Sequence, residues 1–320
     1  RWDVSSVTDM GAMFEDFEGD VGDLSQWNTS SVVNMAAMFM QHYSRRRYGE
    51  RYFNDTGEWK DFHPAWPGSR DVPRTTMILP GATFGNLSGW NVSSVRSMRF
   101  TFSGLGRDWH NMFKHWDVSS VTNMDGIFFK MTNQGRIGDI GSWDVKNVKS
   151  MELAFAWIGH GAIDGLGKWD PKRVQKMQSA FAFSKSVILR QASSWKLDSA
   201  NDIKAMMKGS ECTDVNISWS FGSNVDADSM FVDLNSNALV STTCDVSNMR
   251  TTGITNFRSM FSSRSSYASS TRLPSGFASW DTSSATSMEM MFKGLRFGKI
   301  PSEISHWNVR KVKNMREMFS

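Results

Sequence analysis

The sequence predicts an α/β repeat solenoid in which short strand–helix units stack on one another. A string that begins with Trp and ends in Met-Phe recurs along the 320 residues, and most of its copies start 24 to 31 residues apart. Each copy also combines two apolar spacings, one typical of a strand and one typical of a helix. The composition agrees, because 14 Trp, 22 Met and 22 Phe stand beside only 4 Tyr, a bias expected of a repeated motif.

The repeated string is clearest at Trp116, where Trp-Asp-Val-Ser-Ser-Val-Thr-Asn-Met runs on to Phe128. Copies start at Trp2, Trp27, Trp90, Trp116, Trp143, Trp169, Trp195, Trp280 and Trp307, with degenerate copies near Trp219 and Met249. They predict one domain over residues 1–320, with about eleven units of roughly 26 residues and a truncated unit at either end. The 63 residues from Trp27 to Trp90 hold one unit and an insertion at 41–80.

The first half of each unit predicts a short strand. An apolar residue stands three positions before the Trp and another stands two positions after it, as in Ile140, Trp143 and Val145. Residues two apart in an extended chain point to the same side. This is also the spacing of the strand in leucine-rich repeats, with Trp at the central leucine. Stacking would join these strands in a parallel sheet on one face of a right-handed solenoid.

The second half of each unit predicts a helix of about three turns. In the first unit the apolar residues are Val7, Met10, Met13 and Phe14, whose offsets of 0, 3, 6 and 7 trace one helix face. Ser5 or Ser6 stands where an N-cap residue is expected. Met side chains would then fill the irregular gaps between stacked helices.

The string from Trp116 to Phe128 resembles the repeats of BspA-like leucine-rich-repeat proteins. It is most similar to the Trp-Asp-x-Ser-x-Val-x-x-Met-x-x-Met-Phe repeats of unknown function in mycoplasma surface lipoproteins and in algal and protist proteins. The resemblance covers nearly the whole chain outside residues 41–80. It implies a leucine-rich-repeat-like architecture, a location at the cell surface and, for some relatives, a role in adhesion. It brings no catalytic residues with it.

An Asp or Asn follows each repeat Trp, and two roles are open for it. Asp117, Asp144 and Asp170 would lie on successive rungs and form a row of carboxylates able to bind cations. Alternatively, each side chain accepts a hydrogen bond from the backbone two residues on and closes a turn. The turn role is favoured, because Asn stands at this position as readily as Asp. The members are Asp3, Asn28, Asn91, Asp117, Asp144, Asp170, Asp281 and Asn308.

The insertion at 41–80 is the predicted site of partner contact. It interrupts the period and interleaves basic with aromatic residues, both of which are enriched at binding hot spots. A solvated loop packed on its own units is the alternative, and nucleic acid is less favoured because no binding motif accompanies the basic residues. The predicted contacts are Arg45, Arg46, Arg47, Tyr48, Arg51 and Tyr52, with Trp59 and Trp66 as anchors.

Cysteines and basic residues suggest further features. Cys212 and Cys244 are 32 residues apart, close to one repeat, and either pair in a disulfide or remain buried thiols. Basic residues gather in the middle and last units, as a solvated face or as a surface for an acidic partner. They are Lys146, Lys149, Lys172, Arg173, Lys176, Arg310, Lys311, Lys313 and Arg316.

The sequence favours a non-catalytic module for structure or protein interaction. The net charge of +4 is modest, and no nucleophile motif, phosphate-binding loop or metal-ligand spacing is present, so we expect no enzyme activity, cofactor or metal. No apolar run is long enough for a membrane span. Expected partners are other proteins or neighbouring copies in an assembly, with no small-molecule substrate.

We expect a cell-surface adhesion protein or a scaffold subunit. The alternative function is a carbohydrate- or cation-binding surface on the open sheet face. The expected location is extracellular, and an organellar or filamentous assembly is the alternative.

Overall fold

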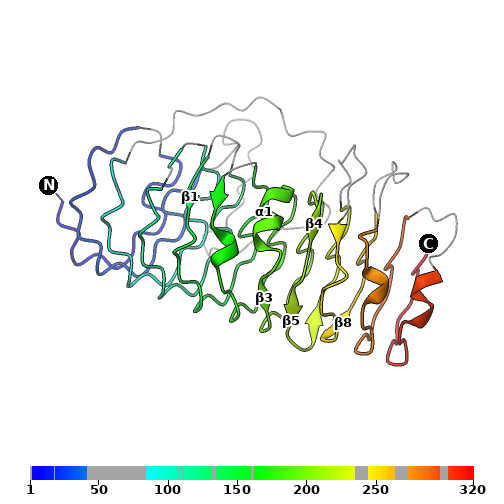
Figure 1. The fold of residues 1–320 in the computed structure, drawn as a ribbon. Coiled ribbons are helices and arrows are strands. Elements are labelled where there is room, and N and C mark those ends of the chain that lie inside the picture. Colours follow the sequence, from blue (N-terminus) through cyan, green and yellow to red (C-terminus); the bar gives the residue numbers. More distant parts are fainter. Residues whose placement is uncertain are drawn as a thin grey trace.

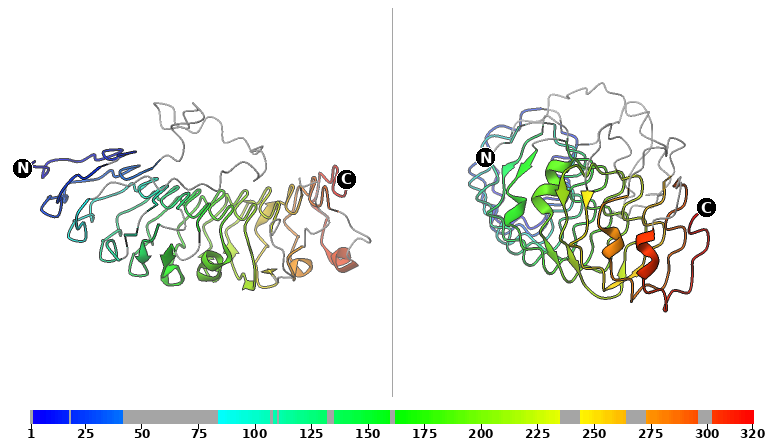
Figure 2. Two further views of the ribbon diagram at one scale, coloured as in Figure 1. Left: turned by 90° about the horizontal axis from the view of Figure 1, so that it is seen from above. Right: turned by 45° about the vertical axis from the view of Figure 1, so that its right-hand side comes forward.

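The units of the chain lie side by side in a row that runs from the N-terminal to the C-terminal part (Figures 1 and 2). This computed structural model describes residues 2–17, 19–41, 84–106, 108–109, 111–131, 135–159, 162–234, 244–263, 273–295 and 302–320. Within these ranges most of the chain is built from turns and extended segments, and regular helices and strands are short. Neighbouring units are therefore joined mainly by backbone hydrogen bonds between turns.

The described ranges contain one α-helix, α1 (Ser186–Ala192). Short 3-10 helices are η1 (Leu166–Lys168), η3 (Phe277–Ser279) and η4 (Ser302–His306). The strands are β1 (Gly138–Asp139), β2 (Ile163–Asp164), β3 (Lys196–Leu197), β4 (Val215–Asn216), β5 (Ser220–Phe221), β6 (Val225–Asp226), β7 (Cys244–Asp245) and β8 (Ile254–Asn256). They pair in parallel as two-stranded sheets: β1 with β2, β3 with β5, β4 with β7 and β6 with β8.

The prediction of an α/β solenoid built from strand–helix units is wrong. The stretches expected to be helical form turns, and α1 lies elsewhere, in the segment before Trp195. No continuous parallel sheet covers one face of the described residues, because each sheet has only two strands of two or three residues. Among the described units, strands follow the Trp only at β3 and β5, directly after Trp195 and Trp219, and each has two residues. Trp143 instead ends a turn, donating its backbone N–H to the carbonyl of Ile140 at 3.1 Å.

The second half of each unit is a series of turns whose backbone N–H groups alternate between two directions. The N–H groups of Met10, Ala12 and Phe14 donate to carbonyls of the next unit at 2.9, 2.8 and 3.0 Å. Those of Met13 and Glu15 donate to the carbonyl three residues earlier in their own unit. In an α-helix every N–H would bond four residues back within one segment. The alternation therefore excludes a helix and joins each unit to its neighbour.

Left-handed backbone conformations make this alternation possible. Ala12 has φ 54° and Gly126 has φ 57°, a region that ends a right-handed helix. The same position is left-handed in the other units, at Ala37, Phe100, Leu153, Ser179, Ala205, Ser229, Ser259, Met290 and Glu317. At Gly126 a Cβ atom would also lie 2.0 Å from the Phe100 ring, so a side chain there requires the ring to move.

Parallel bridges link the units at one residue of the second half, which directly precedes a Met in most units. They connect Asp9, Asn34, Ser97, Asn123, Ser150, Lys176, Asp202, Asp226, Asn256, Ser287 and Asn314 in sequence, with β6 and β8 supplying the step from Asp226 to Asn256. The bridged column thus lies seven residues after the Trp in most units. The parallel pairing between units that the sequence predicted around the Trp is therefore found mainly at this later position.

The core is formed by stacked rows of aromatic rings. Trp90 and Trp116 lie 6.4 Å apart with planes 3° from parallel, and Phe102 stacks on Phe128 at 5.9 Å. The indole N–H of each buried repeat Trp is satisfied across a unit boundary, as when Trp143 Nε1 donates to the Phe113 carbonyl at 2.9 Å, whereas the buried indole N–H of Trp109, outside the repeat position, has no partner among the described residues. The aromatic residues that made the repeat recognisable are therefore buried, and their polar atoms bind neighbouring backbone.

Removing a core Trp should destabilise the protein strongly. Trp143 is 3% exposed, so Trp143→Ala leaves a cavity and removes one of the two hydrogen bonds at the Phe113 carbonyl, and it should lower the free energy of unfolding by about 3–5 kcal/mol. Trp2 is 72% exposed, so Trp2→Ala should lower it by less than about 1 kcal/mol. Denaturant titration followed by fluorescence measures both. Equal losses in the two variants would contradict the ring stack.

Candidate interaction surface

The predicted contact residues of the insertion lie outside the described residues. All eight lie between residues 42 and 83, which the structure does not describe: Arg45, Arg46, Arg47, Tyr48, Arg51, Tyr52, Trp59 and Trp66. Their role in partner contact therefore stays a prediction from the sequence. The surface that the structure positions is that of the stacked units, and its polar groups are considered next.

Seven of the eight Asp and Asn residues after the repeat Trp, all but Asp170, accept a backbone N–H two residues on and close turns, which confirms the favoured interpretation for these seven. The Ser119 backbone N–H donates to Asp117 Oδ1 at 3.0 Å, and the Lys146 N–H donates to Asp144 Oδ1 at 3.1 Å. The same bond forms at Asp3, Asn28, Asn91, Asp281 and Asn308. One carboxylate oxygen of each such Asp is thus occupied by its own turn.

These hydrogen bonds keep the turn carboxylates ionised. Hydrogen bonds from the Ser119 side chain and backbone hold the pKa of Asp117 below its ordinary value of 3.8. A hydrogen bond from the Lys146 side chain does the same for the pKa of Asp144, and Asp170 forms an ion pair with Lys172 at 3.1 Å. In the part of the chain that the structure describes, no three His, Cys, Asp or Glu residues gather as metal ligands would.

A second column of turn-closing residues was missed from the sequence. Asp9 accepts the Gly11 N–H at 2.8 Å, and Asn123 accepts the Asp125 N–H at 2.8 Å. Asn34, Asp202, Asp226, Asn256 and Asn314 make the same contact. A sequence signal for this column was present, because Asp or Asn stands seven residues after the Trp and directly before an apolar residue in several units. This column coincides with the parallel bridges and so fixes the register between units.

Two shallow hollows lie at equivalent places along the Trp side of the stack. One, of about 390 Å³, is lined by Trp169, Asp170, Lys172, Trp195, Lys196 and Asp198, together with Gly167 and Ser194. The other, of about 290 Å³, is lined by Lys114, His115, Trp116, Asp117, Val118, Ser142 and Asp144. Both carry charges of opposite sign and mostly polar surface, while the Trp rings at their floor are nearly buried.

A basic ridge crosses two adjacent units beside these hollows. It consists of Lys146, Lys149, Lys172, Arg173 and Lys176, all exposed. The two units are held together by the parallel bridge from Ser150 to Lys176. Within the ridge, Lys146 pairs with Asp144 at 2.5 Å and Lys172 with Asp170 at 3.1 Å, both in water, and Lys176 approaches the partly buried Glu152 at 3.9 Å. Exposed ion pairs of this kind contribute little free energy to folding.

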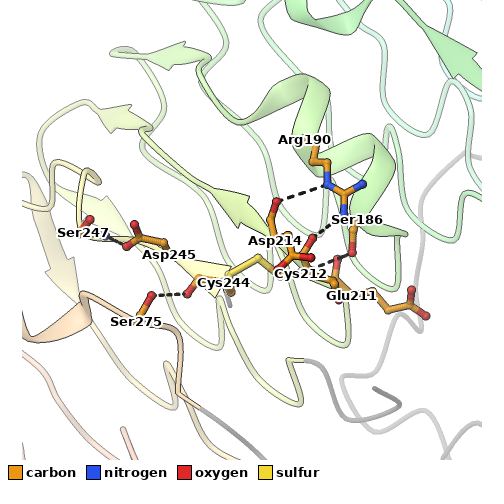
Figure 3. Close-up of a disulfide and its surroundings, with 10 residues drawn as sticks. Ser186, Arg190, Glu211, Cys212, Asp214, Cys244, Asp245, Ser247 and Ser275 are labelled. Atoms are coloured by element: carbon orange, nitrogen blue, oxygen red, sulfur yellow. Dashed lines mark hydrogen bonds between the residues drawn. A yellow bond between two sulfur atoms is a disulfide. The ribbon is translucent and has the colours of Figure 1, made fainter. Parts of the chain in front are cut away.

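Cys212 and Cys244 are joined by a disulfide, with their Cα atoms 5.2 Å apart (Figure 3). The bond links two neighbouring segments, since β4 and β7 pair with Val215 opposite Cys244. Hydrogen bonds hold the backbone on both sides. Ser186 Oγ donates to the Glu211 carbonyl at 3.1 Å, and Ser275 Oγ donates to the Cys244 carbonyl at 3.2 Å.

The repeated units match a known family model, that of the Mycoplasma protein of unknown function, DUF285. The matches cover residues 1–60, 76–160, 129–239, 156–269 and 225–320, which is nearly the whole chain. The chain belongs to this family. The finer resemblance to BspA-like leucine-rich-repeat proteins is not supported by this match, which shows a DUF285 repeat family of unknown function. No curated protein and no solved structure matches the chain.

The DUF285 units contain no candidate membrane span in the ranges that the structure describes. The longest α-helix there is α1, with 7 residues, far shorter than the roughly 20 residues that cross a bilayer.

Breaking the disulfide should destabilise the protein. A cross-link over 32 residues restricts the unfolded chain by about 3–4 kcal/mol in the loop-entropy model. Reductant, or Cys212→Ser with Cys244→Ser, should therefore lower the free energy of unfolding by that amount in a denaturant titration. The double variant is its own control, because reductant should not change it further. Two free thiols in the unreduced protein would contradict the bond.

Asp117 should tolerate Asn but not Ala. Asp117→Asn keeps the acceptor for the Ser119 N–H, whereas Asp117→Ala leaves it to water and should cost about 1 kcal/mol at pH 7. Because the pKa of Asp117 is lowered on folding, its carboxylate stabilises the protein above pH 3.8, and this is lost as the pH falls through the folded pKa. Asp117→Asn should thus lose less stability than wild type between pH 5 and pH 2, measured by denaturant titration. Identical pH profiles would contradict this.

Proposed function

We propose that the chain is a non-catalytic repeat module that binds protein partners along the side of its stacked units. The observation that carries this proposal is that the recurring polar side chains serve the stack itself. The indoles of the buried repeat Trp residues, the turn-closing Asp and Asn, and buried hydroxyls such as Thr101, which donates to the Met35 carbonyl at 2.8 Å, bind backbone. The membership in a repeat family of unknown function agrees with such a role.

The basic ridge is the part of this side surface that we assign to a partner. Lys149 and Arg173 are exposed and make no ion pair among the contacts of the described residues. Arg173 instead donates to Asn147 Oδ1 of the preceding unit at 2.9 Å, which holds its guanidinium on the surface. Uncompensated positive charges on a rigid support attract and orient an acidic surface. The partner is therefore an acidic protein.

The disulfide supports a location outside the cytosol. Disulfides persist in oxidising compartments and are rare where thiols are kept reduced. The Cys212–Cys244 bond is buried within the stack, with both residues at most 3% exposed, so it is part of the fold and not an accessible redox pair. We therefore place the module in an extracellular setting, as a cell-surface adhesion protein or as a scaffold subunit.

Reversing two charges of the ridge tests the proposal. Lys149→Glu with Arg173→Glu should weaken binding to the acidic partner at least about tenfold, since two attractions become repulsions. Proteins retained by the immobilised wild-type chain, but not by this variant, are identified, purified and titrated by calorimetry. Arg310→Glu with Lys311→Glu makes the same charge change on the last unit and should leave this affinity unchanged.

The proposal fails if no purified candidate binds the wild-type chain, or if the two double variants bind equally well. It also fails if a purified preparation shows a catalysed turnover that the ridge variant abolishes, because a non-catalytic module has none.

A further inference from the structure

An acceptor motif for N-linked sugars lies on an exposed turn of the unit that contains Trp90. Asn86, Leu87 and Ser88 form an Asn-x-Ser string in which x is not Pro, the string at which oligosaccharides are attached to Asn. The string alone does not make a site, because chance produces it in any chain rich in Ser. Here Asn86 and Ser88 are exposed, while Leu87 between them is buried in the core. The buried Leu87 therefore holds both polar residues at the surface.

The turn at Asn86 uses the oxygen of the side-chain amide and leaves its nitrogen outside. The Ser88 backbone N–H donates to Asn86 Oδ1 at 2.9 Å. Oδ1 and Nδ2 are bonded to the same carbon, so the contact that directs the oxygen toward the backbone directs the nitrogen away from it. Among the described residues, Nδ2 makes no hydrogen bond. A sugar attached to Nδ2 thus leaves the turn intact.

Other units show that this turn needs only an acceptor. At the same place of the repeat, four residues before the Trp, Asp23 accepts the Ser25 N–H and Asp139 accepts the Gly141 N–H, each at 2.9 Å. A carboxylate therefore closes the turn as well as an amide does. The amide nitrogen of Asn86 has no part in the fold, and it is the atom that the modification requires.

The surroundings of Asn86 leave room for a sugar. A Cβ atom at Gly89 would have no heavy atom within 4 Å, and the same is true of Gly22 in the preceding unit. Gly22 lies next to the turn, since a Cβ atom at Gly85 would be 3.4 Å from its carbonyl oxygen. Open space thus adjoins Asn86 both along its own unit and across the boundary to the preceding one.

Two similar strings are less suited to carry a sugar. Asn28 and Asn91 hold the same position in adjacent units, whose repeat Trp rings lie 6.1 Å apart, so sugars on both would crowd each other. Their Ser hydroxyls are also engaged, since Ser30 Oγ donates to Asn28 Oδ1 and Ser93 Oγ donates to Asn91 Oδ1, both at 2.7 Å. The Ser88 hydroxyl makes no hydrogen bond among the described residues, so its motif is presented whole.

We propose that Asn86 carries an N-linked oligosaccharide. The bond that forms joins Asn86 Nδ2 to the anomeric carbon of the first sugar, and the bond from that carbon to a phosphate oxygen of a lipid-diphosphate-linked donor breaks. The diphosphate leaves with the electron pair, and one amide proton passes to a base of the transferase that binds the donor. Such transfer occurs on exported chains, so this inference rests on the extracellular setting proposed above.

The glycan and the basic ridge belong to different parts of the row. Asn86 lies in the unit of Trp90, whereas the ridge begins in the unit of Trp143, and the unit of Trp116 stands between them. Attachment of the sugar and binding by the ridge can therefore be tested separately.

Site-resolved mass spectrometry of the native chain tests the proposal. The chain is purified from its own cells, and a glycan amidase in water enriched in heavy oxygen converts each sugar-bearing Asn into a labelled Asp. The peptide that holds Asn86 should carry the label. Asn308 closes a turn with the Arg310 N–H but lacks Ser or Thr two residues on, so it should remain unlabelled.

Matched variants separate the motif from the turn. The chain is exported from a eukaryotic cell behind an added secretion leader. Ser88→Ala and Asn86→Asp should each lose the glycan at this position, whereas Ser88→Thr should retain it. Both glycan-free variants should unfold at the denaturant midpoint of the enzymatically deglycosylated wild type, because each keeps the backbone donor and the side-chain acceptor of the turn.

An exported native chain with the Cys212–Cys244 bond intact and Asn86 unlabelled overturns the inference and leaves the proposed location standing. A glycan that persists at Asn86 in Ser88→Ala also overturns it, because attachment would then not depend on the motif. Recovery of the native chain from the cytosol with free thiols contradicts the proposed location, and the inference falls with it.

Discussion

The structure depends on the alternating direction of the backbone N–H groups in the second half of each unit. Every second N–H leaves its own unit, as when Ala12 donates to Ala36 and Met290 donates to Arg316. A single unit therefore cannot satisfy its own backbone, since half of these donors find acceptors only in a neighbour. Stacking is required by the hydrogen bonds before any side chain is buried.

The side-chain rows follow from this backbone ladder. Once the ladder fixes one register for all units, each Trp and each Phe meets its counterpart in the next unit. Trp169 and Trp195 lie 6.0 Å apart, and Phe155 and Phe181 lie 5.3 Å apart. The indole N–H, which would be costly to bury unpaired, reaches a carbonyl of the preceding unit. Trp suits this position better than Leu because it supplies both a large apolar surface and that donor.

The sequence predicted the repeat and the buried residues, but not the conformation of the second half. Apolar residues at Met124, Ile127 and Phe128, with offsets of 0, 3 and 4, share one face of a helix, and they also share one side of the observed series of turns. The left-handed position is held by Gly126 in this unit and by Leu153 in the next, and no β-branched residue holds it in the other described units. Helices also disfavour β-branched residues, so the absence of such residues at this position could not distinguish a helix from the observed turns.

Of the surface features, the turn-closing Asp and Asn could be predicted from the sequence, but the disulfide could not. The free exchange of Asp117 with Asn at the same position indicated a role as hydrogen-bond acceptor, which the turns confirm. The disulfide could not be derived, because Cys212 and Cys244 are 32 residues apart whereas the paired Val215 and Cys244 are 29 apart. Cys212 therefore lies three residues before the residue that pairs with Cys244. An alignment of the repeats does not place the two cysteines opposite each other.

In the proposed binding role, recognition comes from the few surface positions that the stack leaves free to vary. Three residues after the Trp, the chain has Ser93 and Ser119 in two units but Lys146 and Lys172 in the next two, while the Trp and the Asp or Asn beside it persist. The turn is closed by the backbone N–H of this residue, and Ser or Lys side chains here add a second bond to the same Asp or Asn, so Ser and Lys both fit the fold. A change from Ser to Lys there adds charge to the surface and leaves the ladder intact. The side of the row can thus be adapted to a partner unit by unit, while the ladder and the aromatic rows keep every unit in place.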